Sequence, residues 1–113
     1  MRHTEPLRLN RDFKRTYARG RSLAGPLLAL YARPNRSART RLGLTVGAKL
    51  GKAVRRNRVR RRIKEAYRLS EHRFRPGHDL VVVARVRAGG ATYAELEREL
   101  LRLMARLGLV VAP

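Results

Sequence analysis

The stretch from Lys52 to Leu69 combines the densest positive charge in the chain with apolar residues at helical spacing. Seven of the ten positions from Arg55 to Lys64 carry a positive charge. With 100° of rotation per residue, three apolar side chains lie within about 80° of Val59 on a helix. They are Ile63, Ala66 and Tyr67. This pattern predicts an amphipathic helix that buries one side against a core and exposes a cationic side.

The cationic side of this helix is the first candidate for a binding surface. Charged helix faces usually mix both signs, which pair three or four residues apart. Here Glu65 is the only acid between Lys49 and Ser70, and like charges at that spacing destabilise a helix by about 0.2–0.5 kcal/mol per pair. We therefore favour contact with a nucleic acid over a passive, solvated face. Arg55 and Arg56 are expected at the entry of the helix, where the chain is still turning.

The composition of the whole chain agrees with a polyanionic partner. Among 113 residues, 28 are Lys or Arg and 8 are Asp or Glu, which gives a net charge of +20. Such an imbalance destabilises a compact fold through self-repulsion, and a polyanion relieves it. Nucleic acid is the first candidate, and an anionic membrane surface is the second. The 24 arginines suit phosphate recognition, although genome composition or a hot habitat also favours Arg.

Several other classes of protein need residues that this chain lacks. It has no Cys, and hence neither disulfides nor thiolate metal sites. Its first residues lack the apolar core of a signal peptide, and no segment approaches the roughly 20 apolar residues that span a bilayer. We therefore expect a soluble, cytoplasmic protein. His3, His72 and His78 are scattered and no acids are paired for nuclease chemistry, so we expect no catalytic residue and no metal ligand.

The chain reads as one domain over residues 1–113. Residues 1–8 are expected to form a basic, flexible arm, followed by a helix over 11–19 that Asn10 caps and Gly20 ends. Strands are predicted at 26–33, 40–47 and 80–86, with the first two forming a hairpin. Thr92 and Glu95 match a capping box at the start of a last helix. The leucines that this helix turns inward are Leu96, Leu100, Leu103 and Leu107.

This order of elements predicts an α+β fold. Helices pack on a small mixed sheet of about four strands, in the order α-β-β-β-α-β-α. A helix-turn-helix that reads double-stranded DNA would place another helix directly before the basic helix. Here a strand and a glycine-punctuated loop, VGAKLGKAV, precede it, which argues against that motif.

Aromatic residues near the predicted sheet favour single-stranded nucleic acid, whose bases stack on aromatic rings. Phe13 and Tyr17 lie four positions apart and share one face of the first helix. They are either core residues or stacking residues. Tyr31, on an alternating strand, points either into the core or toward the same surface.

The segment RLGLTVGAKLGKAVRRNRVRRRIKEAYRL, residues 41–69, resembles the signature region of the bacterial ribonuclease P protein subunit. That family carries an Arg-Asn-Arg block on a basic helix, matched here by Arg56, Asn57 and Arg58. A basic pair follows the block and is matched by Arg60 and Arg61. PLRLNRDFKRTYARG, LLALY, HDLVVVAR and TYAELEREL also match in order and spacing, so the resemblance covers nearly the whole chain.

The resemblance implies a protein that performs no chemistry itself. In the family, a catalytic RNA supplies the active site and its Mg²⁺ ions, and it removes the 5′ leader of precursor tRNA. The protein subunit binds that RNA and the single-stranded leader, broadens the substrate range and lowers the Mg²⁺ requirement. The implied partners are the ribonuclease P RNA and precursor tRNA, bound by a monomer with one protein per RNA, without a membrane or an organic cofactor. The implied fold has a left-handed βαβ crossover, contrary to the general preference.

The resemblance also assigns residues to the two RNA partners. The expected contacts to the catalytic RNA are Lys49, Lys52, Arg56, Asn57, Arg58, Arg60, Arg61, Lys64 and Arg68. The leader is expected in a cleft between the first helix and the sheet, lined by Phe13, Tyr17 and Tyr31. The family often has two adjacent lysines before the basic helix, whereas Ala48 precedes Lys49 here, which removes one expected phosphate contact. Two rival functions remain open on composition: a structural RNA-binding protein, such as a ribosomal component, and an architectural protein of double-stranded DNA.

Overall fold

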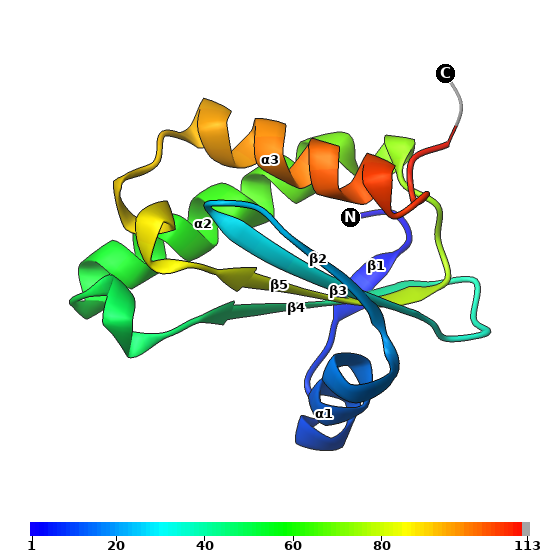
Figure 1. Ribbon diagram of the computed structural model, residues 1–113. Helices are drawn as coiled ribbons and strands as arrows, with labels where there is room; N and C mark the ends of the chain where they lie inside the picture. The colour runs from blue at the N-terminus through cyan, green and yellow to red at the C-terminus, as the bar shows by residue number, and fades with distance from the viewer. Residues whose placement is uncertain (112–113) are drawn as a thin grey trace.

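The computed structural model describes residues 1–111, which form a mixed sheet with helices on both faces (Figure 1). The main elements are β1 (Thr4–Pro6), α1 (Asn10–Arg19), β2 (Arg21–Ala24), β3 (Leu28–Pro34), β4 (Thr40–Val46), α2 (Ala53–Ser70), β5 (His78–Ala84) and α3 (Tyr93–Arg106). Short 3-10 helices between them are η1 (Ala48–Leu50), η2 (Glu71–Arg73) and η3 (Val86–Gly90). The expectation of an α+β fold is confirmed.

Strand β5 occupies the centre of the sheet, whose order is β1-β4-β5-β3-β2. It pairs in parallel with β4 and antiparallel with β3. Its residues Leu80, Val81 and Val82 are almost completely buried, as expected for a continuous apolar run covered on both faces. The predicted hairpin between β3 and β4 is wrong, because β5 lies between them. A strand that is apolar on both faces is stabilised by a neighbour on each edge, and β3 and β4 supply these neighbours.

The two faces of the sheet are covered unequally. Helices α2 and α3 lie side by side on one face, and α1 lies on the other (Figure 1). On β3, Leu28, Leu30 and Ala32 are buried under α2 and α3, so the alternate residue Tyr31 faces the α1 side. The main core therefore lies between the sheet and the helix pair.

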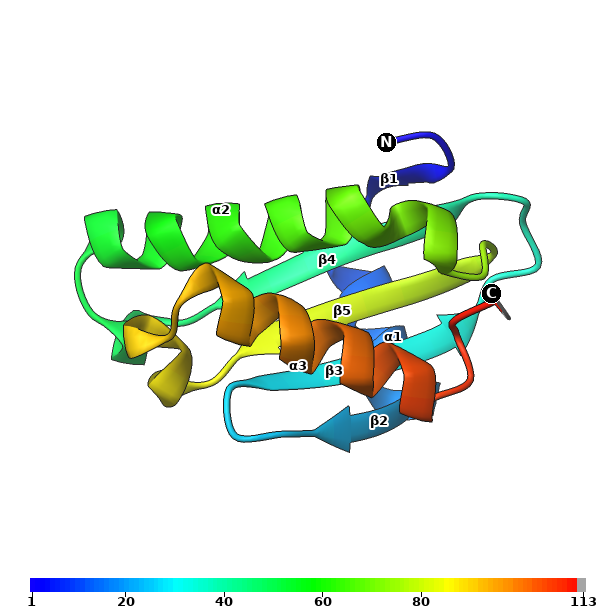
Figure 2. The ribbon, with the colours of Figure 1, turned by 90° about the horizontal axis from the view of Figure 1, so that it is seen from above.

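The connection from β4 through α2 to β5 is a βαβ crossover, because the two strands are parallel neighbours. Seen from the helix side with both strands pointing up, β5 lies to the left of β4 (Figure 2). The crossover is therefore left-handed, the opposite of the hand that most βαβ units have. It places α2 over β4 and leaves the remainder of this face to α3, which contacts β3.

The N-terminal quarter of the chain differs from the expectation in three details. The sheet has five strands rather than about four, because β1 pairs in parallel with β4 and β2 pairs antiparallel with β3. Both are short edge strands without an alternating apolar pattern, so the sequence carried no signal for them. The segment 1–8, expected as an arm, contains β1. Asn10 does not cap α1, since Leu9 is the N-cap residue and its carbonyl accepts from the backbone N–H groups of Asp12 and Phe13.

The later helices agree with the sequence. Helix α2 begins at Ala53, and the capping box at the start of α3 is confirmed by hydrogen bonds from Glu95 N to Thr92 Oγ1 (3.2 Å) and from Thr92 N to Glu95 Oε1 (2.9 Å). The four leucines predicted to face inward from the last helix are buried. Every helix within residues 1–111 is too short or too polar to traverse a lipid bilayer.

Candidate RNA interface

The exposed side of α2 carries a cluster of four basic residues and one asparagine that we call the α2 cationic surface. Its members are Asn57, Arg58, Arg60, Arg61 and Lys64, all exposed to solvent. The predicted apolar stripe, Val59, Ile63, Ala66 and Tyr67, forms the other side of the helix and is at most 1% exposed. The stripe fixes the rotation of α2, so the cations are held outward along a helix about 27 Å long.

The cations of this surface are largely free to bind an external anion. Among residues 1–111, no salt bridge involves Arg58, Arg61 or Lys64. Arg60 donates to the side chain of Asn57 over 3.3 Å, which orients both groups without neutralising the charge. The surface therefore presents exposed forked guanidinium donors, whose geometry matches that of phosphate oxygens.

Three of the residues that the sequence assigned to RNA lie at the two ends of this surface. Lys49 on η1 and Lys52, the N-cap residue of α2, are exposed before the helix. Arg68 lies in the last turn and pairs with Glu65 at 2.5 Å. The hydrogen bond from Arg68 lowers the pKa of the Glu65 carboxyl. Part of the charge of Arg68 is thus already compensated, in contrast to the α2 cationic surface.

The expectation for Arg55 and Arg56, at the start of α2, is wrong. Arg55 and Arg56 lie inside the regular helix rather than at a turning entry, because the helix starts at Ala53 and Arg56 N donates to Lys52 O over 3.0 Å. Arg56 is half-buried, and its Nε has no hydrogen-bond partner in the described part of the chain. Arg55 lies against Gly89, where an added Cβ would come within 2.7 Å of the Arg55 Nε.

The opposite face of the sheet carries the three aromatic residues singled out in the sequence, here called the aromatic surface. The rings of Tyr17 and Tyr31 meet edge-on, with centroids 4.9 Å apart, and Phe13 lies 6.5 Å from Tyr17. None of the three belongs to the buried core, and Tyr17 is 38% exposed. The structure thus brings α1 and β3 aromatics together in a position that bases could reach by stacking.

Two residues of β4 shape this aromatic surface. The Tyr17 hydroxyl is 2.8 Å from the Thr45 hydroxyl, which ties α1 to the sheet. Gly43 makes room for Phe13, since a Cβ at this position would come within 2.5 Å of the ring. The sequence pattern contained a signal for both residues, because Arg41, Gly43 and Thr45 alternate with the buried face of the strand.

A buried ionic network fixes α1 beside that surface. Arg41 on β4 donates to both carboxylate oxygens of Asp79 on β5, at 2.8 and 2.6 Å, and to Asp12 on α1 at 3.1 Å. Asn35 also donates to Asp79, over 3.0 Å. Burial by itself raises the pKa of Asp79, but the hydrogen bonds from Arg41 and Asn35 lower it below the ordinary value. Sequence reasoning missed this network, because its members are far apart along the chain.

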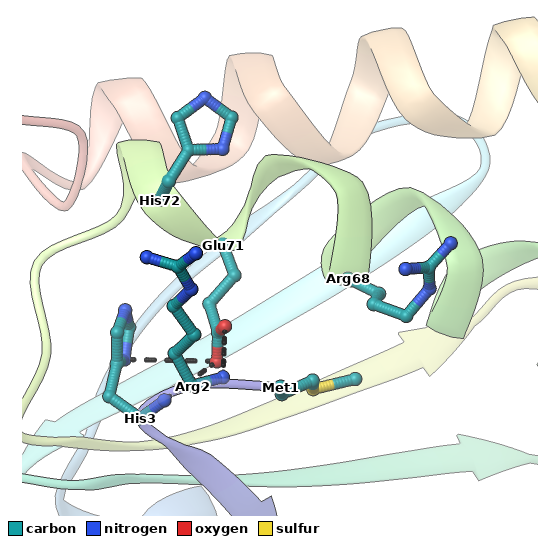
Figure 3. A pocket seen from close by; sticks show the side chains of 6 residues that line it. All are labelled: Met1, Arg2, His3, Arg68, Glu71 and His72. Carbon is teal, nitrogen blue, oxygen red and sulfur yellow. Dashed lines mark hydrogen bonds and ion pairs between the residues drawn. The ribbon is translucent and has the colours of Figure 1, made fainter.

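A second buried carboxylate holds the N-terminal strand. The backbone N–H groups of Arg2 and His3 donate to Glu71 at 2.7 and 3.3 Å, and Figure 3 shows the Glu71 side chain reaching from the helical ribbon toward the N-terminal segment. Next to this contact, the Thr4 and Tyr67 hydroxyls lie 3.0 Å apart in the interior. Burial, together with the nearby negative charge of Glu71, raises the pKa of Tyr67 to about 12, although the hydrogen bond with Thr4 opposes this shift. The end of α2 thereby fixes where β1 lies along the sheet.

The His, Asp and Glu side chains are the residues of this chain that could bind a metal ion. Among residues 1–111, no three His, Cys, Asp or Glu side chains gather in a group that could hold a metal ion. The buried acids already described, Asp79 and Glu71, are engaged by Arg41 and by backbone N–H groups. These two buried carboxylates are therefore hydrogen-bonded within the protein.

The fold and the two surfaces define a class of protein: a small, strongly basic α+β protein built to bind nucleic acid. The family model described as Ribonuclease P matches residues 1–108. The chain belongs to the ribonuclease P protein family. It is therefore an RNA-binding protein of tRNA processing, and its partners are the ribonuclease P RNA and precursor tRNA.

Curated relatives and solved structures agree with this membership. The chain is 39% identical to the ribonuclease P protein component of Clostridioides difficile over 109 residues, which cover 96% of each protein. It is 40% identical to that of Alkaliphilus metalliredigens over 110 residues, covering 97% of this chain and 99% of the relative. The Staphylococcus aureus RNase P protein structure superposes with a TM-score of 0.86 at 29% identity, covering 94% of this chain and 97% of the other. The Thermotoga maritima protein gives 0.83 at 33% identity, covering 90% and 96%.

Proposed function

We propose that this chain is a non-catalytic subunit that binds the catalytic RNA through α2 and the single-stranded 5′ leader of precursor tRNA through the aromatic surface. The observation that carries the proposal is the arrangement of the two surfaces. Helix α2, which carries the α2 cationic surface, and helix α1, which carries two residues of the aromatic surface, lie on opposite faces of one sheet (Figure 1). A protein of this form can hold two RNA segments at a fixed separation.

The first role of the protein is electrostatic. The cations from Arg56 to Lys64 neutralise phosphates where the catalytic RNA folds closely on itself, which lowers the Mg²⁺ concentration that the RNA needs. The RNA supplies the active site and binds the Mg²⁺ ions, and the residues of this chain bind and orient RNA. If about seven phosphates are engaged, the single-strand coefficient gives a log–log salt slope near −5.

The second role is substrate discrimination. Phe13, Tyr17 and Tyr31 stack on leader bases, and each stacked base stabilises the complex by about 1–3 kcal/mol. The mature tRNA lacks these bases, so the complex prefers the precursor and releases the product. This preference broadens the range of precursors that the RNA processes. The working particle contains one monomeric protein per RNA and acts in the cytoplasm.

Reconstitution with the catalytic RNA tests the proposal. Protein stripped of nucleic acid is added to ribonuclease P RNA at a Mg²⁺ concentration too low for the RNA alone, and leader cleavage is measured. The proposal predicts cleavage only when both components are present. Cleavage by the polypeptide alone contradicts a non-catalytic role, and no stimulation of the RNA contradicts the proposed role of α2.

The same assay separates the two rival functions. A ribosomal RNA-binding protein would bind RNA without stimulating leader cleavage. An architectural DNA protein would bind duplex DNA tightly and leave processing unchanged. The aromatic surface also argues against the DNA rival, since duplex DNA offers no unstacked bases to it.

A further inference from the structure

Helix α1 carries a third group of cations, which neither the resemblance nor the family membership assigns. With 100° per residue, Phe13 and Tyr17 lie about 40° apart on the side of α1 that faces the sheet. Four basic side chains lie between about 100° and 240° from Phe13 and point away from the sheet. We call them the α1 outer ridge: Arg11, Lys14, Arg15 and Arg19. All four are exposed.

The α1 outer ridge differs from an ordinary charged helix face. The exposed basic residues of α3, such as Arg98 and Arg102, alternate with Glu95, Glu97 and Glu99, and Arg102 pairs with Glu99 at 3.3 Å. Such mixing of signs is typical of a solvated helix. On α1 there is no comparable compensation, so the charge on this face remains available to a partner.

The single acid of α1 is buried and compensates little of the charge of the ridge. Asp12 is 5% exposed and accepts from Arg41 at 3.1 Å, so its charge is engaged inside the protein. Arg15 lies 4.0 Å from Asp12, at the limit of an ion pair. Among residues 1–111, no salt bridge involves Arg11, Lys14 or Arg19. Like charges at this spacing destabilise an isolated helix, and a bound polyanion would relieve the repulsion.

The position of the ridge indicates which polyanion it meets. Lys14 follows Phe13 directly on α1, so the ridge borders the aromatic surface. The α2 cationic surface lies across the sheet (Figure 1). An RNA strand that leaves the aromatic surface along α1 therefore passes the ridge, whereas RNA bound to α2 lies on the far side. From Arg11 to Arg19 the helix rises about 12 Å.

We propose that the α1 outer ridge binds backbone phosphates of single-stranded RNA upstream of the leader bases on the aromatic surface. The inference rests on the proposed function, because it requires the leader to occupy the aromatic surface. The ridge offers cations without aromatic rings, so the affinity that it supplies comes from phosphates rather than from stacked bases. The affinity gained from a longer leader therefore depends on charge and on salt, and not on the added sequence.

The test uses the holoenzyme and two precursor tRNAs, one with a short leader and one with that leader extended at its 5′ end by oligouridine. The variant is Arg11→Gln with Lys14→Gln. The matched control is Arg98→Gln with Arg106→Gln, which removes the same charge from exposed positions on α3. In the wild type and the control, the extension should raise affinity on the order of tenfold at about 0.1 M salt. In the α1 variant most of this gain should be lost, and the salt slope should be smaller by about 1.4, which is about 0.7 for each of the two removed contacts.

The results distinguish a failure of the ridge proposal from a failure of the proposed leader binding. An extension with uncharged methylphosphonate linkages should give no gain with any protein. If the wild type gains nothing from the charged extension, or if the α1 variant keeps the gain, the ridge does not bind the leader. Failure of the proposed function itself gives a different result, since the short leader would then confer no preference over mature tRNA in the wild type. If the α1 variant and the α3 control lose the affinity gain equally, the extension is attracted by the net positive charge of the protein, and the assignment to the ridge is overturned.

Discussion

Arg41 and Asp79 form a two-pronged ion pair across the parallel strands β4 and β5, with Nε–Oδ1 and Nη2–Oδ2 distances of 2.8 and 2.6 Å. The remaining Nη1 of Arg41 reaches Asp12 on α1 at 3.1 Å. Asp79 is 1% exposed, so its charge has little access to water. One guanidinium group thereby connects the centre of the sheet to the helix that carries Phe13 and Tyr17.

Replacing Arg41 should therefore destabilise the whole domain. Arg41→Met leaves two buried carboxylates without their cation, and we expect a loss of about 3 kcal/mol in the free energy of unfolding. Urea denaturation followed by circular dichroism measures this loss. Arg39→Met is the matched control, because the Arg39–Glu5 pair is exposed at both ends and should change stability by at most about 1 kcal/mol. Equal effects of the two variants would contradict the role of Arg41.

Glu71 should make the stability of the fold depend on pH. Burial opposes ionisation of Glu71, but hydrogen bonds from the Thr4 hydroxyl and from the backbone of Arg2 and His3 lower its pKa. Because the folded pKa lies below the unfolded value of about 4.3, the stabilisation is complete above that value. It is lost as the pH falls through the folded pKa. We expect Glu71→Gln to cost about 1–2 kcal/mol at pH 7 and less in acid.

Unfolding measured between neutral pH and about pH 3 checks this difference. The control is Glu5→Gln, since the Glu5 side chain is 49% exposed and should alter the pH profile little. Part of the acid sensitivity should persist in Glu71→Gln, because the pKa of Asp79 is lowered as well. If the free energy of unfolding of Glu71→Gln changes with pH in parallel with that of the wild type, the role of Glu71 is contradicted.

The contact between Gly43 and Phe13 predicts a coupled loss of stability and leader binding. In Gly43→Ala the new methyl group meets the Phe13 ring, which must shift together with α1, at a cost of about 1–3 kcal/mol. We also expect weaker discrimination between precursor and mature tRNA. Gly47→Ala is the matched control, because nothing lies within 4 Å of a Cβ there. Binding of both tRNAs to the holoenzyme measures the effect, and a normal preference in Gly43→Ala would show that Phe13 is dispensable.

Substitutions of Arg61 and of Phe13 should impair different activities of the protein. Arg61→Ala removes one exposed phosphate contact, so assembly with the catalytic RNA weakens and the log–log salt slope falls by about 0.7. Phe13→Ala removes a stacking ring, so the preference for precursor over mature tRNA falls by about 1–3 kcal/mol while assembly is kept. Titrations of both variants with both RNAs test this division. Identical defects would show that the two surfaces do not act separately.

Helix α2 shows what the sequence could predict. Its cationic side and its buried stripe are both local patterns with helical spacing, and the structure has both where the pattern placed them. The capping box of Thr92 and Glu95 is equally local. The continuous apolar run of β5 correctly indicated a strand buried on both faces.

Two errors are local, the N-cap of α1 and the start of α2, whereas the larger errors concern contacts between distant parts of the chain. The pairing of β4 with β5 rather than β3 depends on competition among strands, which periodicity does not describe. Arg41, Asp12 and Asp79 each look like ordinary surface charges in the sequence, and only folding brings them together. Tyr31 could not be placed on a face of the sheet until the neighbours of β3 were known.

The hydrogen bonds that hold the segment before β1 have a consequence for the order in which the chain folds. Residues 2 and 3 are held by a carboxylate 69 and 68 positions further along the chain. A growing polypeptide therefore cannot make this contact until Glu71, the first residue of η2, has left the ribosome. Because closing so long a loop is entropically costly until its contacts form, we expect the contacts of residues 2 and 3 with Glu71 to form late in folding.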